Sequence, residues 1–370
     1  MNLQNNWKKL KQSSERFRYW PKISGWFSNI KSKIITFDIK PAKPIVPQLL
    51  VDFDAAMATD DRNAAENCLL SILRVNANNQ AALFLLANLY INANAKHEAH
   101  KILRHALKLY PNDYRMHKLL GRMHAAQGKY KASVAAYRQS LKLNPDSPEV
   151  QYFLDAVEGR APTIAPREYI IGLYDDYAVR FEKSLLQHLK YHAHIDLVNI
   201  LQTHAQLAQP ISTVLDLGCG TGLLGQELCA KLQITTLIGI DLSANMLAAA
   251  QAKNIYTSLE NSDLIEYLQN HSEVFELILA ADVLIYFGEL EHIFSAVFQR
   301  LQPRGYFAFT VEALQQGSVK LQANGRFQHS WSYIDTVVVR NGFRKIYSQG
   351  IDLRKEYGNI VPGYLVLLQK

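Results

Sequence analysis

VLDLGCGTGLLGQEL, residues 214–228, decides the fold of the second half of this chain. An apolar run ends in a cluster of glycines and an amphipathic stretch follows, which predicts a buried strand, a tight loop and a helix. Read from Gly220, the stretch has the spacing Gly220-x-Gly222-x-x-Gly225, and Asp241 follows 21 residues after Gly220. This spacing is typical of a loop that binds the phosphates of a dinucleotide. It leaves open which adenosine cofactor the loop binds.

Similar apolar runs continue from about residue 166 to the end of the chain. We expect strands at residues 213–217, 236–241, 277–281 and 306–311. Amphipathic stretches lie between these runs, which indicates a doubly wound α/β domain with a parallel sheet. Two closing runs, 343–350 and 363–369, predict an antiparallel hairpin at the edge of that sheet.

Three features favour a cofactor with an amino acid tail over a dinucleotide. Asp216 lies inside the first strand, where a carboxylate is costly unless loop amides or a cationic ligand partner it. The G-C-G-T-G loop, residues 218–222, is tight and leaves room for backbone atoms of a ligand rather than for a pyrophosphate. Asp263 follows a further strand, so that Asp216, Asp241 and Asp263 supply one acid per strand.

On these residues, 166–370 resembles the class I S-adenosylmethionine-dependent methyltransferases, which have a Rossmann-like sheet. The resemblance implies that S-adenosyl-L-methionine is the cofactor and that the glycine loop receives its methionine end. Asp241 would bind both ribose hydroxyls and Asp263 the adenine amine, with Leu242 and Met246 on one side of the adenine and Leu264 on the other. The expected cofactor-binding residues are Asp216, Gly218, Gly220, Gly222, Asp241, Leu242, Met246, Asp263, Leu264, Tyr174 and Tyr177. The alternatives are a helix N-cap for Asp241 and a turn acid without a ligand for Asp263.

Residues 49–158 contain an internal repeat of 34 residues. Small residues recur where two helices approach closely, and Pro111 and Pro145 stop the second helix of each unit. This pattern resembles the tetratricopeptide repeat, with a degenerate earlier unit at about 46–79 and a capping helix at 147–158. The repeats bind a protein partner, or they pack or dimerise the domain that follows; both interpretations stay open.

The whole layout is similar to bacterial predicted methyltransferases that contain tetratricopeptide repeats. The hallmark stretches are LYDDYAVRFEKSLLQHLKY (173–191), AADVLIYFGEL (280–290), RFQHSWSYI (326–334) and DLRKEYGNIVPGYLVLLQK (352–370). A vertebrate relative without the repeats shares the pattern of the catalytic domain. The substrate of this family is undefined, so we expect either a small-molecule acceptor or a protein that the repeats present.

The basic charge of the chain lies in its first 48 residues. The formal net charge is +7, and residues 1–48 hold ten lysines and arginines against two acids, so the remainder is close to neutral. We interpret this segment as a basic, aromatic leader and linker. It is partly disordered, or forms helices docked on the rest of the chain, or lies peripherally on an anionic membrane surface or a partner. The neutral remainder makes a nucleic acid an unlikely substrate, since binding one usually requires a basic face.

Candidate residues for the acceptor side follow the fourth strand and the helix before the sheet. Asp282 orients substrate, binds the methionine amine through water or caps the next helix. Tyr174 and Tyr177 cover the cofactor or pack their helix down. His329, our first candidate for a general base, and Tyr333 have i, i+4 spacing and would share one helix face. The catalytic candidates are therefore His329, Asp282 and Tyr333.

The remaining predictions concern an ion pair, two kinds of chemistry that the sequence disfavours, the cellular location and an alternative function. Arg354 and Glu356 project to one face of a strand, which favours a sheet-edge ion pair over a contact with substrate. The region after the fourth strand lacks the Asn/Asp-Pro-Pro-aromatic motif common in methylation of base amines, and methyl transfer needs no metal. Three cysteines without framework spacing and the lack of a long apolar run suggest the cytoplasm. A cofactor-binding scaffold without methyl transfer is the alternative function.

Overall fold

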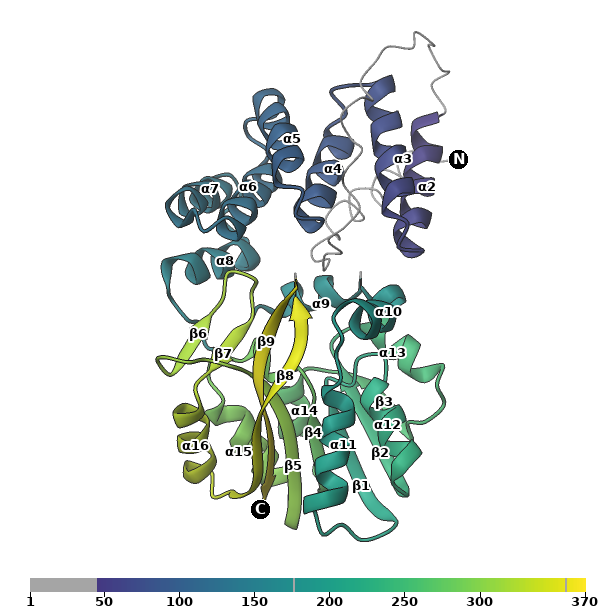
Figure 1. Ribbon diagram of the computed structural model, residues 1–370, viewed down its shortest axis with the longest axis vertical. Coiled ribbons are helices and arrows are strands. Elements are labelled where there is room, and N and C mark those ends of the chain that lie inside the picture. Colours follow the sequence, from purple (N-terminus) through teal and green to yellow (C-terminus); the bar gives the residue numbers. More distant parts are fainter. Residues whose placement is uncertain (1–44, 176, 357) are drawn as a thin grey trace. The chain divides into compact units, whose positions relative to one another are not determined.

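The structure, a computed structural model, describes residues 45–175, 177–356 and 358–370. The chain divides between Leu154 and Asp155 into two compact units; the described residues of the first form helices, and the second is built on a sheet (Figure 1). Most of the predicted basic leader falls on residues 1–44, outside the described residues. Residues 45–48, which we assigned to the linker, instead begin helix α2, so that part of the prediction is wrong.

The first unit consists of consecutive helix pairs. They are α2 (Ile45–Ala58) with α3 (Arg62–Val75), α4 (Gln80–Asn92) with α5 (Lys96–Leu109), and α6 (Tyr114–Ala126) with α7 (Tyr130–Leu143), followed by α8 (Pro148–Glu158). The 34-residue period is confirmed, because α4 and α6 begin 34 residues apart and so do α5 and α7. In the degenerate first pair, Ala65, Leu69 and Ile72 are fully buried, as the repeat pattern predicts.

Small residues allow the paired helices to approach. A Cβ atom placed on Gly121 of α6 would lie 2.5 Å from the ring of Tyr137 of α7, which is fully buried. The Ser133 hydroxyl donates to the carbonyl of Gly121 at 2.8 Å. Asn94 and Gly128, one period apart, both follow the first helix of a pair with positive φ, which closes the turn to the second helix.

The second unit is built on one nine-stranded sheet. The parallel strands are β1 (Ile211–Leu217), β2 (Ile234–Asp241), β3 (Ser258–Asn261), β4 (Phe275–Ala280) and β5 (Leu301–Ala313), in the order β3-β2-β1-β4-β5. β9 (Asn359–Gln369) pairs antiparallel with β5, and β8 (Arg344–Glu356) pairs with β9 at the edge. The doubly wound parallel sheet and its antiparallel closing hairpin are therefore confirmed. The short β6 (Val319–Leu321) and β7 (Phe327–His329) extend the sheet beside the end of β5.

Helices cover both faces of this sheet. Leu197 and Leu201 of α11 (Ala193–His204) pack with α12 (Leu223–Lys231) on the face of β5 that carries Tyr306 and Ala308. Phe294 of α15 (Glu291–Arg300) contacts Phe307 and Phe309 on the opposite face, with ring centroids 5.2–5.4 Å apart. The remaining helices of this region are α13 (Ala244–Gln251), α14 (Leu264–Asn270) and α16 (Trp331–Arg340). The result is a three-layer Rossmann-like fold.

A helical segment precedes the sheet and reaches the site described below. It comprises α9 (Arg167–Asp175), the one-turn elements η1 (Ala178–Arg180) and α10 (Phe181–Lys183), and the π-helical η2 (Ser184–His188). None of the helices in the described parts of the chain is both long enough and apolar enough to cross a membrane.

Candidate cofactor and acceptor site

The glycine loop after β1 turns through three left-handed residues, Gly218 (φ 66°), Gly220 (φ 54°) and Gly222 (φ 80°). A Cβ on Gly218 would lie 2.2 Å from Cγ2 of Val283, and one on Gly222 would lie 2.9 Å from the ring of Tyr256. A Cβ on Gly220 would meet a single atom within 4 Å, on the ring of Phe181 at 3.8 Å. The loop thus packs tightly at Gly218 and Gly222 and leaves space at Gly220.

Asp216 lies within β1 and is 1% exposed. Its carboxylate accepts a hydrogen bond from the hydroxyl of Tyr256 at 2.7 Å, a partner that the sequence did not indicate. Burial raises the pKa of Asp216 to about 7; the Tyr256 hydrogen bond lowers it and the nearby Asp241 raises it. A carboxyl group so placed gains most from a cationic ligand, because such a ligand would stabilise the ionised form.

Asp241 ends β2 and faces the glycine loop. Its Oδ2 accepts from the backbone N–H of Gly220 at 2.9 Å, and its Oδ1 accepts from the N–H of Ser243 at 2.8 Å. Burial raises its pKa to about 6, against the effect of these two hydrogen bonds. Asp241 is not the N-cap of α13, because the Ser243 side chain accepts from the N–H of Met246 in that role. The carboxylate instead holds the loop and the start of α13 together.

The residues predicted to surround an adenine ring come from the starts of two helices. Asp263 is the N-cap of α14, and its Oδ1 accepts from the N–H groups of Ile265 and Glu266. Leu264 is 6% exposed and Met246 is fully buried, whereas Leu242 is half-buried. Asp263 therefore has a structural role as a cap, and its proposed contact with adenine stays a prediction.

Tyr174 and Tyr177 both pack the segment before the sheet. The Tyr174 hydroxyl shares a 2.9 Å hydrogen bond with that of Tyr286, and the Tyr177 hydroxyl donates to Ser184 at 2.6 Å. Both rings contact Phe181, the residue nearest the space at Gly220, with centroids 6.1 and 5.4 Å away. Tyr174 and Tyr177 therefore pack against Phe181, and the three rings form an aromatic cover over the glycine loop.

Two polar contacts connect this aromatic cover to the glycine loop and to the start of α13. The Thr221 hydroxyl donates to Glu182 at 2.7 Å, and the Ser243 hydroxyl donates to Asp175 at 2.6 Å. Glu182 also forms an ion pair with Lys253. The segment from α9 to α10 is therefore tied to the loop after β1 and to the start of α13.

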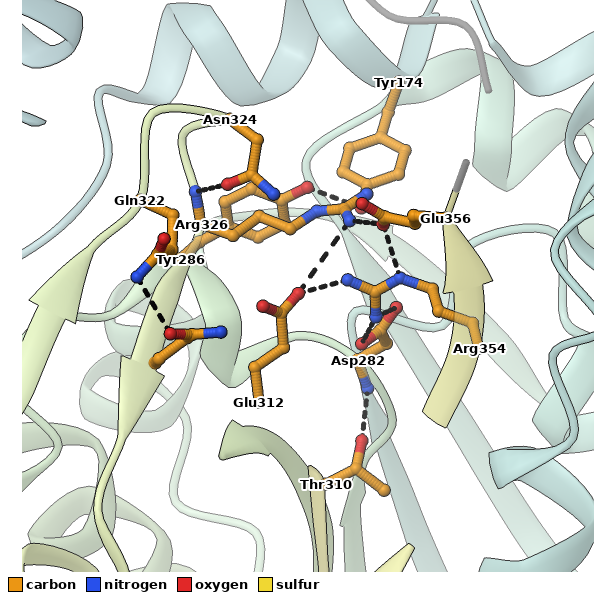
Figure 2. A network of polar contacts seen from close by, with 11 residues as sticks. Tyr174, Asp282, Tyr286, Thr310, Glu312, Gln322, Asn324, Arg326, Arg354 and Glu356 are labelled. Atoms are coloured by element: carbon orange, nitrogen blue, oxygen red, sulfur yellow. Dashed lines mark hydrogen bonds and ion pairs between the residues drawn. The ribbon is translucent and has the colours of Figure 1, made fainter. Parts of the chain in front are cut away.

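A buried ion-pair network lies at the carboxyl end of β4 and β5 (Figure 2). Arg354 of β8 is 2% exposed, and its guanidinium donates to Asp282 at 2.9 and 3.1 Å, to Glu356 at 2.7 Å and to Glu312 of β5. Arg326, in the turn between β6 and β7, pairs with Glu356 and lies 3.8 Å from Glu312. The predicted ion pair of Arg354 and Glu356 is confirmed, but it belongs to a larger network.

The pKa values of Glu312 and Glu356 are shifted in opposite directions by their surroundings. Burial raises the pKa of Glu312, although Arg354 and Arg326 act in the opposite direction. Burial would also raise the pKa of Glu356, but the two arginines outweigh it and lower the value to about 2. Asp282 caps no helix, since the following one-turn element η3 (Leu284–Tyr286) begins after Val283 and has no side-chain cap. The alternative of a capping role for Asp282 is therefore wrong.

His329 and Tyr333 do not share a helix, which corrects our prediction. His329 is the last residue of β7, opposite Ala313 of β5, and Ser330 caps α16 through a hydrogen bond from the N–H of Tyr333. The His329 ring is fully buried, and burial lowers its pKa to about 4, against backbone groups of Phe287 and Gly288 that raise it. The two rings stack at 5.8 Å, and the Tyr333 hydroxyl accepts from the N–H of Leu290. The complete burial of its ring argues against His329 as the general base.

Sequence reasoning missed several residues of the site. Glu312 could have been found by the same signal as Asp216, because both are acids within an apolar strand. Tyr256 had no such signal, although Gly222, Gly225 and Gly239 all make room for its side chain. Gly225, the last glycine of the spacing Gly220-x-Gly222-x-x-Gly225, has a packing role, because a Cβ there would lie 2.4 Å from the Tyr256 hydroxyl.

Comparison with known proteins divides the chain in the same way as its fold. Residues 215–307 match a family described as a methyltransferase domain, and residues 86–148 match the tetratricopeptide repeat family. The chain is 31% identical over 106 residues to a trans-aconitate 2-methyltransferase of Deinococcus radiodurans, covering 28% of this chain and 40% of that protein. It is 31% identical over 139 residues to a malonyl-[acyl-carrier protein] O-methyltransferase of Priestia megaterium, covering 37% of this chain and 46% of that protein. The chain thus spans less than half the length of these relatives.

A solved S-adenosylmethionine-dependent methyltransferase of Clostridium acetobutylicum aligns with 53% of this chain and 98% of its own, at 18% identity and a TM-score of 0.40. The strand order, rather than this score, defines the fold. The matched families agree with the two units of the structure, since the repeat match lies in the helical unit and the other match spans β1 to β5. This chain therefore joins tetratricopeptide repeats to a Rossmann-like methyltransferase domain.

Proposed function

We propose that this chain transfers a methyl group from S-adenosyl-L-methionine to a small molecule or to a protein that the repeats present. The arrangement of Asp241 carries the proposal: a carboxylate with a pKa raised to about 6 lies at the end of β2, beside a left-handed loop with space at Gly220. Ligands of doubly wound sheets bind at this edge, next to the glycine loop. The buried Asp216 favours a cofactor with a cationic group over a dinucleotide.

The described residues fit the proposed cofactor. Asp241 would accept the ribose hydroxyls, Asp216 would face the cationic methionine end, and Asp263 with Leu242, Met246 and Leu264 would surround the adenine. When bound, S-adenosylmethionine supplies an electrophilic methyl group. The protein mainly has to orient the acceptor and exclude water, for which the cover formed by Tyr174, Tyr177 and Phe181 is suited.

The same proposal assigns the repeats and the limits of the domains. Residues from the start of α2 at Ile45 to residue 158 would form the repeat domain, and 166–370 the methyltransferase domain. The repeats would contact a protein partner or a second copy of the chain, and the basic segment before α2 would contact a membrane surface peripherally. A cytoplasmic location is consistent with this assignment.

Transfer of label tests the proposed function. Purified full chain, labelled S-adenosylmethionine and a cell extract should give labelled acceptor, and Asp241→Asn should abolish the transfer. In an asparagine an NH2 donor replaces one of the two carboxylate oxygens, so one of the N–H groups of Gly220 and Ser243 loses its acceptor. Asp335→Asn is the matched control, because Asp335 of α16 forms a partly exposed ion pair with Lys345 of β8. Tight cofactor binding without transfer to any fraction would instead favour the scaffold alternative.

A further inference from the structure

The loop after β4 brings Asp282 next to the cofactor loop. A Cβ on Gly218 would lie 2.2 Å from Val283. The loop after β4 therefore packs so closely against the glycine loop that residue 218 has no room for a side chain. Asp282, the residue before Val283, has a left-handed φ of 58°, a conformation that few non-glycine residues adopt. Such strain persists where surrounding contacts enforce it, and it is common at functional sites.

Several contacts hold Asp282 in this conformation. Its backbone N–H donates to the Thr310 hydroxyl at 2.9 Å, and Nη1 of Arg354 donates to both carboxylate oxygens. Arg354 is itself fixed by Glu312 and Glu356, and its side chain is 1% exposed. The Asp282 side chain remains 19% exposed, so a rigid carboxylate stays accessible beside the cofactor loop.

Carboxylates outnumber guanidinium groups in the network around Asp282. Three carboxylates, Asp282, Glu312 and Glu356, share two guanidinium groups, and both arginines already pair with carboxylates. Arg326 is 23% exposed, but it pairs with Glu356. A carboxylate entering here would meet an excess of like charge and no unpaired guanidinium of this network. An N–H group would instead provide a hydrogen-bond donor, and a positive charge would balance the excess.

On the basis of the function proposed above, we propose that Asp282, positioned by Arg354, accepts a hydrogen bond from the nitrogen of the methyl acceptor, so that the acceptor is an amine rather than a carboxylic acid. The acceptor thus differs in class from that of the O-methyltransferase relative, whose name indicates transfer to oxygen. Asp282 is then a catalytic residue that touches substrate, and Arg354 is a positioning residue.

The transfer balances without any further reactant except water. An acceptor that binds as its ammonium ion first releases one proton to water, which exposes the nitrogen lone pair. The lone pair then forms the new bond to the methyl carbon, the bonding pair of the carbon–sulfur bond stays with sulfur, and the methylated nitrogen keeps the positive charge. Asp282 holds the N–H that points away from the methyl group, which aligns the lone pair with the carbon that it attacks.

The chemical stability of the product tests this inference. The wild-type chain is incubated with methyl-labelled S-adenosylmethionine and cell extract, and the labelled product is treated with base. We expect label that is stable to base and that remains with a basic, cation-exchanger-binding product. Label released as volatile methanol would identify a methyl ester and overturn the inference alone, as would base-stable label in a non-basic product. Absence of label in every fraction would overturn the proposed function and this inference with it.

Substitution of Asp282 tests the residue assignment. Asp282→Asn keeps the size of the side chain, and we expect kcat/KM for the labelled acceptor to fall about 10- to 100-fold, mainly through KM, because a hydrogen bond to a charged group is lost. The Kd for S-adenosylhomocysteine should change less than twofold, which also shows that the variant is folded. Asp335→Asn is the control. An unchanged kcat/KM in Asp282→Asn, or an equal loss in the control, would refute the assignment.

Discussion

Replacing Arg354 with methionine should lower the free energy of unfolding of the second unit by about 3–5 kcal/mol. The guanidinium is almost completely buried and is the shared partner of Asp282, Glu312 and Glu356. Without it, Glu312, whose side chain is 2% exposed, keeps only Arg326 at 3.8 Å. Chemical denaturation of the full chain, followed by the near-ultraviolet signal of the aromatic core, measures the change.

Lys345→Met is the matched control for Arg354→Met. Lys345 lies on the same strand, but its ion pair with Asp335 is 39% and 45% exposed, so its loss should cost less than about 1 kcal/mol. Adding Glu312→Gln to Arg354→Met should recover part of the lost stability, because the uncompensated buried charge is removed. Equal effects of the two methionine variants would show that the buried network does not stabilise the fold as described.

Asp216→Asn should stabilise the free protein while it weakens cofactor binding. Because burial raises the pKa of Asp216 to about 7, the native state resists ionisation that the unfolded chain undergoes near pH 4. Stability from this group is complete below pH 4 and is lost as the pH rises toward 7. The titratable groups that interact with Asp216 are the Tyr256 and Tyr191 hydroxyls, the Asp241 carboxyl and the Cys219 thiol. An asparagine removes this loss and still accepts from Tyr256.

The free energy of unfolding of Asp216→Asn should exceed that of the wild type by an amount that grows by about 3 kcal/mol between pH 5 and pH 8. Its affinity for S-adenosylmethionine should fall about 10- to 100-fold, as expected for loss of a charged hydrogen-bonding group. Denaturant titrations at several pH values and binding titrations at pH 8 measure the two effects. An advantage independent of pH, or one shared by Asp335→Asn, would contradict the assigned ionisation of Asp216.

Much of this fold could be predicted from local patterns. The 34-residue period places small residues at helix contacts, and apolar runs bounded by turns locate the strands of the sheet. The acids at the ends of β1 and β2 were visible because a carboxylate in or after an apolar run is uncommon. The strand before Asp263, which is β3, was inferred only from that acid, because β3 is four residues long, has no fully buried position and carries no apolar run.

The acceptor side depended on contacts between distant segments. The Arg354 network joins residues from the loop after β4, from β5, from the turn after β6 and from β8, so no spacing within one element predicts it. The prediction for His329 failed for a different reason, because it relied on spacing within a single predicted helix. Its i, i+4 spacing from Tyr333 suggested one helix, but Ser330 caps α16 and separates the strand that ends at His329 from the helix that follows.

Binding of two ligands at pH 7.5, measured by isothermal titration calorimetry on the full chain, tests the central claim most directly. We predict saturable binding of S-adenosylhomocysteine with a Kd below about 100 µM and no detectable binding of NAD. Asp241 is common to both cofactor types, whereas the buried Asp216 favours the ligand with a cationic amino acid end. Tight binding of NAD without binding of S-adenosylhomocysteine would contradict the account.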